Sequence, residues 1–332
     1  MYVKICSIIG FITLIAFASC NNTEDNNSLL SQPPYDKLTD SITAAPQNAD
    51  LYYHRGGLLY SNNQFQLSEN DLLHAWTLQP KEEYALSIIT LLKQKNTDSA
   101  LQFIRTAIPV LPNSIALKVG EARGFQQKKL YDSAIVVCNA ILERYPNQLD
   151  ALLLKSDILK DLNRNAEALQ LKEQAYKLAP LDRELAYDLA YDYAMAKNPN
   201  ALQLTDTLIK KDNTENVAKA YYVKATYFNN INNDKEALKN YDSAIASNFN
   251  FLDAYLDKGQ MLYNQNNLSA AEKNFQLALR VSPGTAAFYF WLAKTQQAEH
   301  KIQDASLNYQ RAYGLDKTMK EAKDSADKLS AR

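Results

Sequence analysis

Small and aromatic apolar residues recur along this chain at spacings of three and four, as in Ala237, Tyr241 and Ala244. Such spacings place the side chains on one face of an α-helix. Polar runs such as Asn264-Gln265-Asn266-Asn267 separate the apolar segments and indicate turns. The pattern predicts helices of about a dozen residues, joined by polar turns, over nearly the whole chain.

The pattern itself repeats along the chain. Five prolines recur at intervals of 34, 32, 34 and 34 residues: Pro46, Pro80, Pro112, Pro146 and Pro180. Two sets of alanines are each spaced by 34 residues: Ala100, Ala134 and Ala168, then Ala237, Ala271 and Ala305. Proline lacks an amide hydrogen and ends a helix, so a following Asn113, Asn147 or Asp182 is expected to cap the next one.

This repeat resembles the tetratricopeptide repeat (TPR), a pair of helices with alanines and an aromatic residue at fixed places in the second helix. Ala271, Phe275 and Ala278 occupy those places in one unit. The resemblance covers about residues 49–319. It implies an all-α fold, a right-handed α-solenoid of about eight TPR helical hairpins with capping helices. The units are expected to begin near Ala49, Lys81, Ile115, Leu149, Arg183, Ala218, Leu252 and Ala286.

Small residues and helical caps complete the predicted array. Gly56 and Gly259 stand where a small side chain lets the two helices of a hairpin approach closely. Residues 35–45 and 320–330 are expected to be capping helices, because the ends of a stack would otherwise expose its core. The fifth unit has a longer connection at residues 212–216, interpreted as a local bend, with a hinge as the alternative.

The first residues indicate export from the cytoplasm. Lys4 precedes an apolar stretch over residues 5–17, which is too short to span a bilayer. Ala18-Ser19-Cys20 resembles the lipobox of bacterial lipoproteins, which implies acylation of Cys20, for example with palmitate. The sequence thus predicts a lipoprotein signal peptide at 1–19, a flexible tether at 20–34 and a TPR solenoid at 35–332. An ordinary signal peptide with a coincidental cysteine is the alternative.

The residues after Cys20 refine the expected location. Asn21 in place of Asp resembles the pattern of outer-membrane sorting in Gram-negative lipoproteins, and Glu24 and Asp25 resemble the export tag of surface lipoproteins of the Bacteroidota. The chain is therefore expected in the cell envelope, lipid-anchored at the outer membrane. Of the three cysteines, Cys6 lies in the predicted signal peptide and Cys20 is the expected acylation site. Cys138 is the third and is expected to be a buried structural thiol.

Charge and chemistry exclude several functions. The 36 basic and 37 acidic residues nearly balance, and no basic block suggests nucleic acid as a partner. Glu184, Asp188 and Asp192 are spaced by four along one helix face, but an acidic stripe is favoured over a calcium or acid–base site. His54, His74 and His300 are scattered. The sequence predicts no enzyme, no cofactor and no metal site.

Resemblance to TPR proteins implies a ligand groove along the first helices of the units. The residues projected into it are Tyr53, Tyr60, Asp157, Glu184, Tyr187, Asp188, Tyr191, Tyr222, Tyr263 and Phe290. The same positions carry nine acids and five bases, so a net acidic groove lined by tyrosines is expected. A set of residues that would clamp a terminal carboxylate is missing, which favours a neutral-to-basic protein segment.

These features predict a scaffold that binds an unidentified envelope protein or peptide. The alternative is a glycan-binding lipoprotein of a nutrient-uptake system, because aromatic side chains can also contact sugars.

Overall fold

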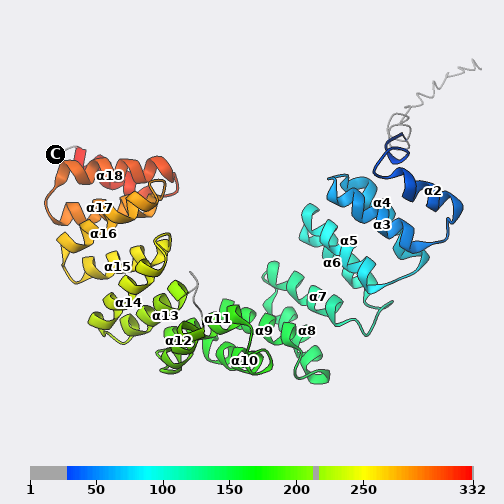
Figure 1. Cartoon of the computed structure of the whole chain (residues 1–332), viewed down its shortest axis with the longest axis horizontal. Helices are drawn as coiled ribbons and strands as arrows, with labels where there is room; N and C mark the ends of the chain where they lie inside the picture. Colours follow the sequence, from blue (N-terminus) through cyan, green and yellow to red (C-terminus); the bar gives the residue numbers. More distant parts are fainter. Residues whose placement is uncertain (1–27, 212–216, 331–332) are drawn as a thin grey trace, which may run out of the picture. The chain divides into compact units, whose positions relative to one another are not determined.

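The computed structural model describes residues 28–211 and 217–330. Every regular element within these ranges is a helix (Figure 1). The expected signal peptide, Cys20, the beginning of the tether and the connection at 212–216 lie outside the described residues. No described helix is long and apolar enough to cross a membrane.

The chain divides into two compact units, the first ending at Leu154 and the second beginning at Lys155. The helices of the first unit are α2 (Asp36–Ala44), α3 (Ala49–Ser61), α4 (Phe65–Leu78), α5 (Glu82–Lys95), α6 (Thr97–Ala107), α7 (Ile115–Gln127) and α8 (Tyr131–Arg144). The boundary falls inside α9 (Leu149–Asp161).

The second unit continues with the same kind of element. Its helices are α10 (Asn165–Leu178), α11 (Arg183–Met195), α12 (Asn200–Lys211), α13 (Val217–Asn230), α14 (Asp234–Ser247), α15 (Leu252–Asn264), α16 (Leu268–Val281), α17 (Ala286–Ala298), α18 (Ile302–Leu315) and α19 (Lys320–Ser330). From α3 to α18 the helices form eight consecutive pairs, preceded by α2 and followed by α19. The predicted all-α fold of about eight hairpins with capping helices is confirmed.

Polar side chains cap several helix starts. Asp182 accepts a hydrogen bond from the amide of Leu185 at 3.1 Å, as the sequence predicted. Ahead of α7 the cap is Ser114, whose hydroxyl accepts from the amide of Leu117 at 3.1 Å. The prediction of Asn113 as this cap is wrong by one residue, because α7 begins at Ile115 and the residue directly before it is Ser114.

Most hairpin turns share one unusual backbone conformation. Among the residues that the structure describes, seven non-glycine residues have φ between 56° and 64°: Asn63, Lys129, Asn163, Lys197, Asn232, Asn266 and His300. Each lies in the turn between the two helices of a hairpin. The α5–α6 pair differs, because the single residue Asn96 ends one helix and caps the next by accepting from the amide of Ser99.

Small residues let paired helices pack closely, as predicted. A Cβ atom built on Gly259 would lie 2.3 Å from Cζ of Phe275, whose ring is fully buried. Gly56 is similar, because its Cβ would lie 2.9 Å from Cγ of Leu72. The thiol of Cys138 is fully buried, which agrees with the structural role expected for it.

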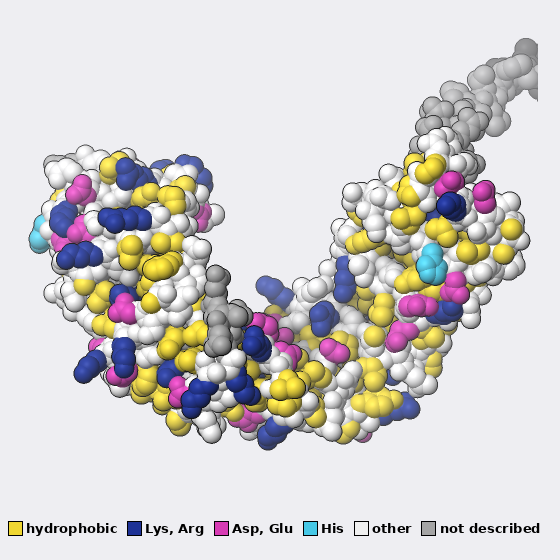
Figure 2. All heavy atoms as spheres, viewed as in Figure 1, with side chains coloured by type: hydrophobic (Ala, Val, Ile, Leu, Met, Phe, Trp, Pro, Cys, Tyr) yellow, Lys and Arg dark blue, Asp and Glu magenta, His cyan; other side chains and the backbone are white. Residues whose placement is uncertain are grey.

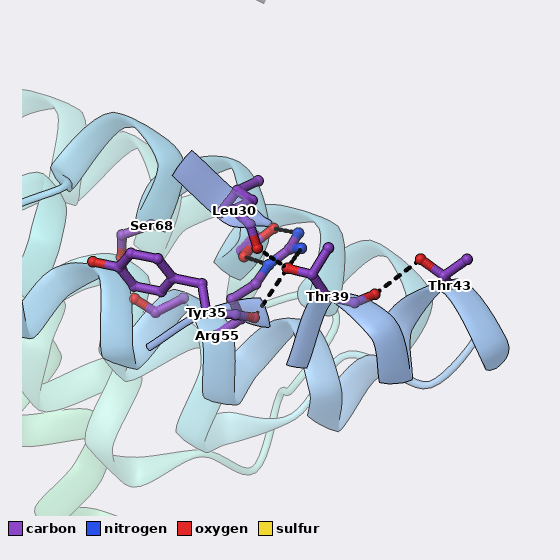
Figure 3. A network of polar contacts seen from close by, with 8 residues as sticks. Leu30, Tyr35, Thr39, Thr43, Arg55 and Ser68 are labelled. Atoms are coloured by element: carbon purple, nitrogen blue, oxygen red, sulfur yellow. Dashed lines mark hydrogen bonds and ion pairs between the residues drawn. The ribbon is translucent and has the colours of Figure 1, made fainter. Parts of the chain in front are cut away.

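A buried ion pair of the first hairpin also contacts the N-terminal capping helix (Figure 3). Arg55 on α3 donates from Nε and Nη2 to the two carboxylate oxygens of Asp71 on α4, at 2.7 and 2.8 Å. Its Nη1 donates to the hydroxyl of Thr39 on α2 at 3.0 Å. Thr39 in turn donates to the carbonyl of Leu30 at 2.7 Å. The network therefore joins Leu30, which lies within the predicted tether, and Thr39 of the capping helix to the core of the first repeat.

Candidate functional site

A hollow of about 430 Å³ opens on the first helices of three consecutive hairpins in the second unit. It is lined by Tyr191 and Met195 of α11, Tyr222, Thr226, Asn229 and Asn230 of α13, Asp234 and Tyr241 of α14, and Asp257, Gln260, Met261 and Asn264 of α15, followed by Gln265. All of these elements belong to the second unit.

A tyrosine–carboxylate pair lies in the hollow. The hydroxyl of Tyr222 donates to Oδ2 of Asp257 at 2.7 Å. Burial, and then this hydrogen bond, raise the pKa of Tyr222, so its hydroxyl stays protonated and remains a donor. Burial also raises the pKa of Asp257 above its ordinary value, although the bond from Tyr222 opposes that effect. This carboxylate therefore gains a proton more readily than an ordinary aspartate.

The charge of the hollow is one-sided. It contains the carboxyl groups of Asp234 and Asp257, and no lysine or arginine of residues 28–211 and 217–330 lines it. In the part of the chain that the structure describes, neither carboxylate forms an ion pair. The remaining polar groups are mainly amides that can both donate and accept. A cation or a neutral polar group would therefore be compatible with this surface.

Two of the predicted groove residues line this hollow. Tyr191 is 37% exposed, and Tyr222 is half-buried. Tyr187 was expected beside them, but it is only 1% exposed and belongs to the core beneath Lys219, whose Nζ lies 5.0 Å from its ring centre. The placement of Tyr187 on the groove surface is thus corrected: its ring packs between helices.

The other predicted residues lie elsewhere. Glu184 and Asp188 are exposed and face Lys219, at 2.7 and 3.9 Å from its Nζ. Tyr263 and Phe290 are half-buried and both contact the ring of Trp291, at 5.7 and 6.0 Å between centroids. These contacts do not bring the four residues into the hollow.

In the first unit, Tyr53 and Tyr60 are half-buried on α3. The ring of Tyr53 packs against that of Tyr84 at 4.7 Å, and the hydroxyl of Tyr60 accepts from Gln94 at 2.6 Å. In the second unit, Asp157 lies on the surface of α9, and the protein atoms around its carboxyl group exclude enough water to raise its pKa.

The acidic stripe of α11 is divided among different partners. Asp192 pairs with Lys160 at 2.6 Å and with the buried Lys172 at 2.5 Å, whereas Glu184 pairs with Lys219. Within residues 28–211 and 217–330, no three His, Cys, Asp or Glu side chains gather as a metal-binding group would. On the face seen in Figure 2, basic and acidic side chains are interspersed.

The sequence reasoning missed the amides and Met195. Thr226 and Gln260 occupy the same repeat position as Tyr191, and Asn230 and Asn264 the same position as Met195. Both positions lie on the first helices, along which the TPR resemblance implies the groove. The residues were overlooked because only aromatic and charged side chains were projected onto it; counting amides would have revealed the cluster.

Comparison with known proteins identifies the repeat. The family model described as "Tetratricopeptide repeat" matches residues 252–285, which contain the α15–α16 hairpin. A tetratricopeptide repeat protein from Parabacteroides merdae is similar in structure, with a TM-score of 0.57, 16% identity, and coverage of 75% of this chain and 98% of that one. The C-terminal part of a TPR repeat-containing protein from Cytophaga hutchinsonii gives a TM-score of 0.53, 16% identity, and coverage of 74% and 99%. At these identities the likeness concerns the fold.

One curated relative is much longer than this chain and matches it over only part of its length. The human protein O-mannosyl-transferase TMTC1 is 25% identical over 209 residues, which make up 58% of this chain. The match spans only 24% of that relative. The transferase named there is therefore a property of the longer human protein.

Proposed function

Because this chain folds as an array of tetratricopeptide repeats, we propose that it is a non-enzymatic scaffold, anchored by lipid at Cys20 in the cell envelope. Stacked helical repeats generally present extended surfaces for binding other proteins. The hollow between α11 and α15 would hold a segment of a protein partner. We place the anchored chain at the outer membrane, on the strength of the residues that follow Cys20.

The observation that carries this proposal is the chemistry of the hollow. Asp257 and Asp234 supply negative charge without a basic partner among the described residues. Tyr191 and Met195 offer exposed apolar surface, and tyrosine faces attract cations. Amides around them can bind the main chain of an extended peptide. A peptide with a lysine or arginine between apolar residues fits these groups.

The amides also favour a second candidate function. Asn229, Asn230 and Gln260 present several donors and acceptors beside Tyr191, and such a surface can bind sugar hydroxyls as well as peptides. A glycan-binding lipoprotein is therefore the alternative, and the two functions differ in their need for the charge of Asp257.

The peptide proposal predicts a strong dependence on Asp257. A labelled acetyl-Ala-Leu-Lys-Leu-Ala-amide peptide is titrated into the purified chain and followed by fluorescence polarisation. Replacing Asp257→Asn removes the charge but keeps the shape, and we expect the affinity to fall about tenfold, which corresponds to the loss of one charge-assisted hydrogen bond. Tyr191→Ala should weaken binding as well, because it removes the exposed ring.

The matched control is Asp253→Asn, which removes an exposed carboxylate on the same helix outside the hollow. Its affinity should stay within about twofold of the parent. Because the pKa of Asp257 is raised, the binding of the lysine peptide should also weaken with falling pH before an ordinary aspartate titrates. Equal binding by the lysine peptide and its glutamine analogue, together with saturable oligosaccharide binding, would favour the glycan function.

The anchor has its own test. Cells that express the chain are labelled with a palmitate analogue, and the label should be lost in Cys20→Ala, because the acylated thiol is then missing. Cys138→Ala is the control and should keep the label, since that thiol is fully buried. Label that persists after Cys20→Ala contradicts the proposed anchor.

A further inference from the structure

A second hollow, of about 290 Å³, lies in the first unit and has a different character. It opens between α5 and α7, the first helices of consecutive hairpins. Its main lining residues are Leu86, Ile89 and Lys93 of α5, Val119 and Arg123 of α7, and Asp150 near the start of α9. All of them precede the boundary at Leu154, so this hollow belongs to the first unit alone.

Two basic side chains face this hollow without a partner. Among the residues that the structure describes, no carboxylate lies within ion-pair distance of Lys93 or Arg123, and neither side chain donates a hydrogen bond. Partial burial, and next the nearby charge of Arg123, lower the pKa of Lys93. Two like charges therefore share one site, although acidic residues are as frequent as basic ones in the chain.

The floor of this hollow is apolar. Ile89 is 4% exposed and Val119 is 8% exposed, and Leu86 borders them at the surface. Water and salt screen the attraction between an anion and the two cations less beside such a floor than in open solvent. The floor also offers room for the aliphatic carbons that carry the anion.

We propose that the hollow between α5 and α7 binds a carboxylate, carried by an acidic side chain of a peptide whose neighbouring residues are aliphatic. Lys93 and Arg123 would donate to the carboxylate oxygens, and Ile89 and Val119 would contact the aliphatic carbons. Asp150 on the rim leaves the site with a net charge of one positive unit, which suits a single negative charge better than a phosphate dianion.

This site differs from the one proposed in the second unit. The sequence indicated an acidic groove throughout, because bases and acids were counted together over all the units. The structure resolves that average into one hollow with unpaired carboxylates and another with unpaired cations. The carboxylate site is independent of the proposed scaffold function, since neither its residues nor its ligand chemistry are shared with the other hollow.

The test uses the complete chain and a labelled acetyl-Ala-Leu-Glu-Leu-Ala-amide peptide. We expect it to bind about tenfold more tightly than its glutamine analogue, as one charge-assisted contact implies. The double substitution Lys93→Gln with Arg123→Gln should abolish this difference. Lys118→Gln is the matched control, because Lys118 lies on α7 outside the hollow, and it should preserve the difference.

Two further arms make the outcome decisive. The lysine peptide used for the second unit should bind the double variant as it binds the parent, which shows that the variant is folded. A phosphoserine peptide should bind less tightly than the glutamate peptide. The proposal is overturned if the glutamate and glutamine peptides bind the parent equally, if Lys118→Gln lowers affinity as much as the double substitution, or if phosphoserine binds best.

Discussion

Replacing Asp71→Ala should unfold the N-terminal end of the repeat array under conditions in which the rest of the chain stays folded. The substitution leaves the guanidinium of Arg55 buried without its counter-charge, since the two side chains are 8% and 9% exposed. Removing one partner of a buried pair typically costs about 3–5 kcal/mol. Stacked repeats contact only their neighbours, so the loss should concentrate in α2, α3 and α4. Amide hydrogen exchange, read helix by helix, measures it.

The control for Asp71→Ala is Asp98→Ala. Asp98 pairs with Lys128 at the surface and its side chain is 75% exposed. Such pairs contribute about 0–1 kcal/mol, so exchange in the first unit should hardly change. The double substitution Arg55→Met with Asp71→Leu should recover much of the loss, because it removes both charges. Exchange in α2 to α4 that is no faster in Asp71→Ala than in Asp98→Ala would contradict the assigned role of the pair.

The second large effect is expected at Gly259. In Gly259→Ala the new Cβ would lie 2.3 Å from Cζ and 2.4 Å from Cε1 of Phe275, and 2.7 Å from Nδ2 of Asn274. The ring is fully buried, and Asn274 is held by its bond to the carbonyl of Tyr255 at 2.7 Å. Overpacking costs about 1–3 kcal/mol, while alanine gains only about 1 kcal/mol in helix propensity. Net destabilisation should appear in urea unfolding of the second unit.

A second glycine tests whether the close contact, and not the substitution itself, lowers the stability. Gly57 lies within α3, and a Cβ built there meets no atom within 4 Å. Gly57→Ala should therefore stabilise its unit by about 0.5–1 kcal/mol. Adding Phe275→Leu to Gly259→Ala should relieve part of the clash, since the smaller side chain withdraws from the new methyl group. A gain in stability in both glycine variants would refute the close approach of α15 and α16.

The sequence predicted the hairpins well because their determinants are local. The spacing of Ala271, Phe275 and Ala278 is enough to define one face of a helix. The same spacing recurs in other units, so each unit supports the prediction of the others. The same reasoning could not find the Arg55–Asp71 pair, since its partners are 16 residues apart on different helices and nothing in the spacing joins them.

The candidate site was only partly predictable. Repeat positions identified the face on which Tyr191 and Tyr222 lie, because position in a repeat fixes direction. They could not show that Tyr187, in the same helix, is covered, because burial depends on how neighbouring side chains fill the space between helices. Nor could charge totals show that Lys93 and Arg123 share a hollow and form an ion pair with no described carboxylate.

The positive φ angles in the hairpin turns limit which residues can replace the present ones. Asparagine tolerates positive φ better than most side chains, and four of the seven such positions carry it, namely Asn63, Asn163, Asn232 and Asn266. Lys129, Lys197 and His300 fill the same conformation in other hairpins. Substitutions at these seven positions should therefore favour asparagine and glycine, whatever ligand the protein binds. None of the seven residues lines either hollow, so a substitution there changes the stability of a hairpin without changing the residues that line the two hollows.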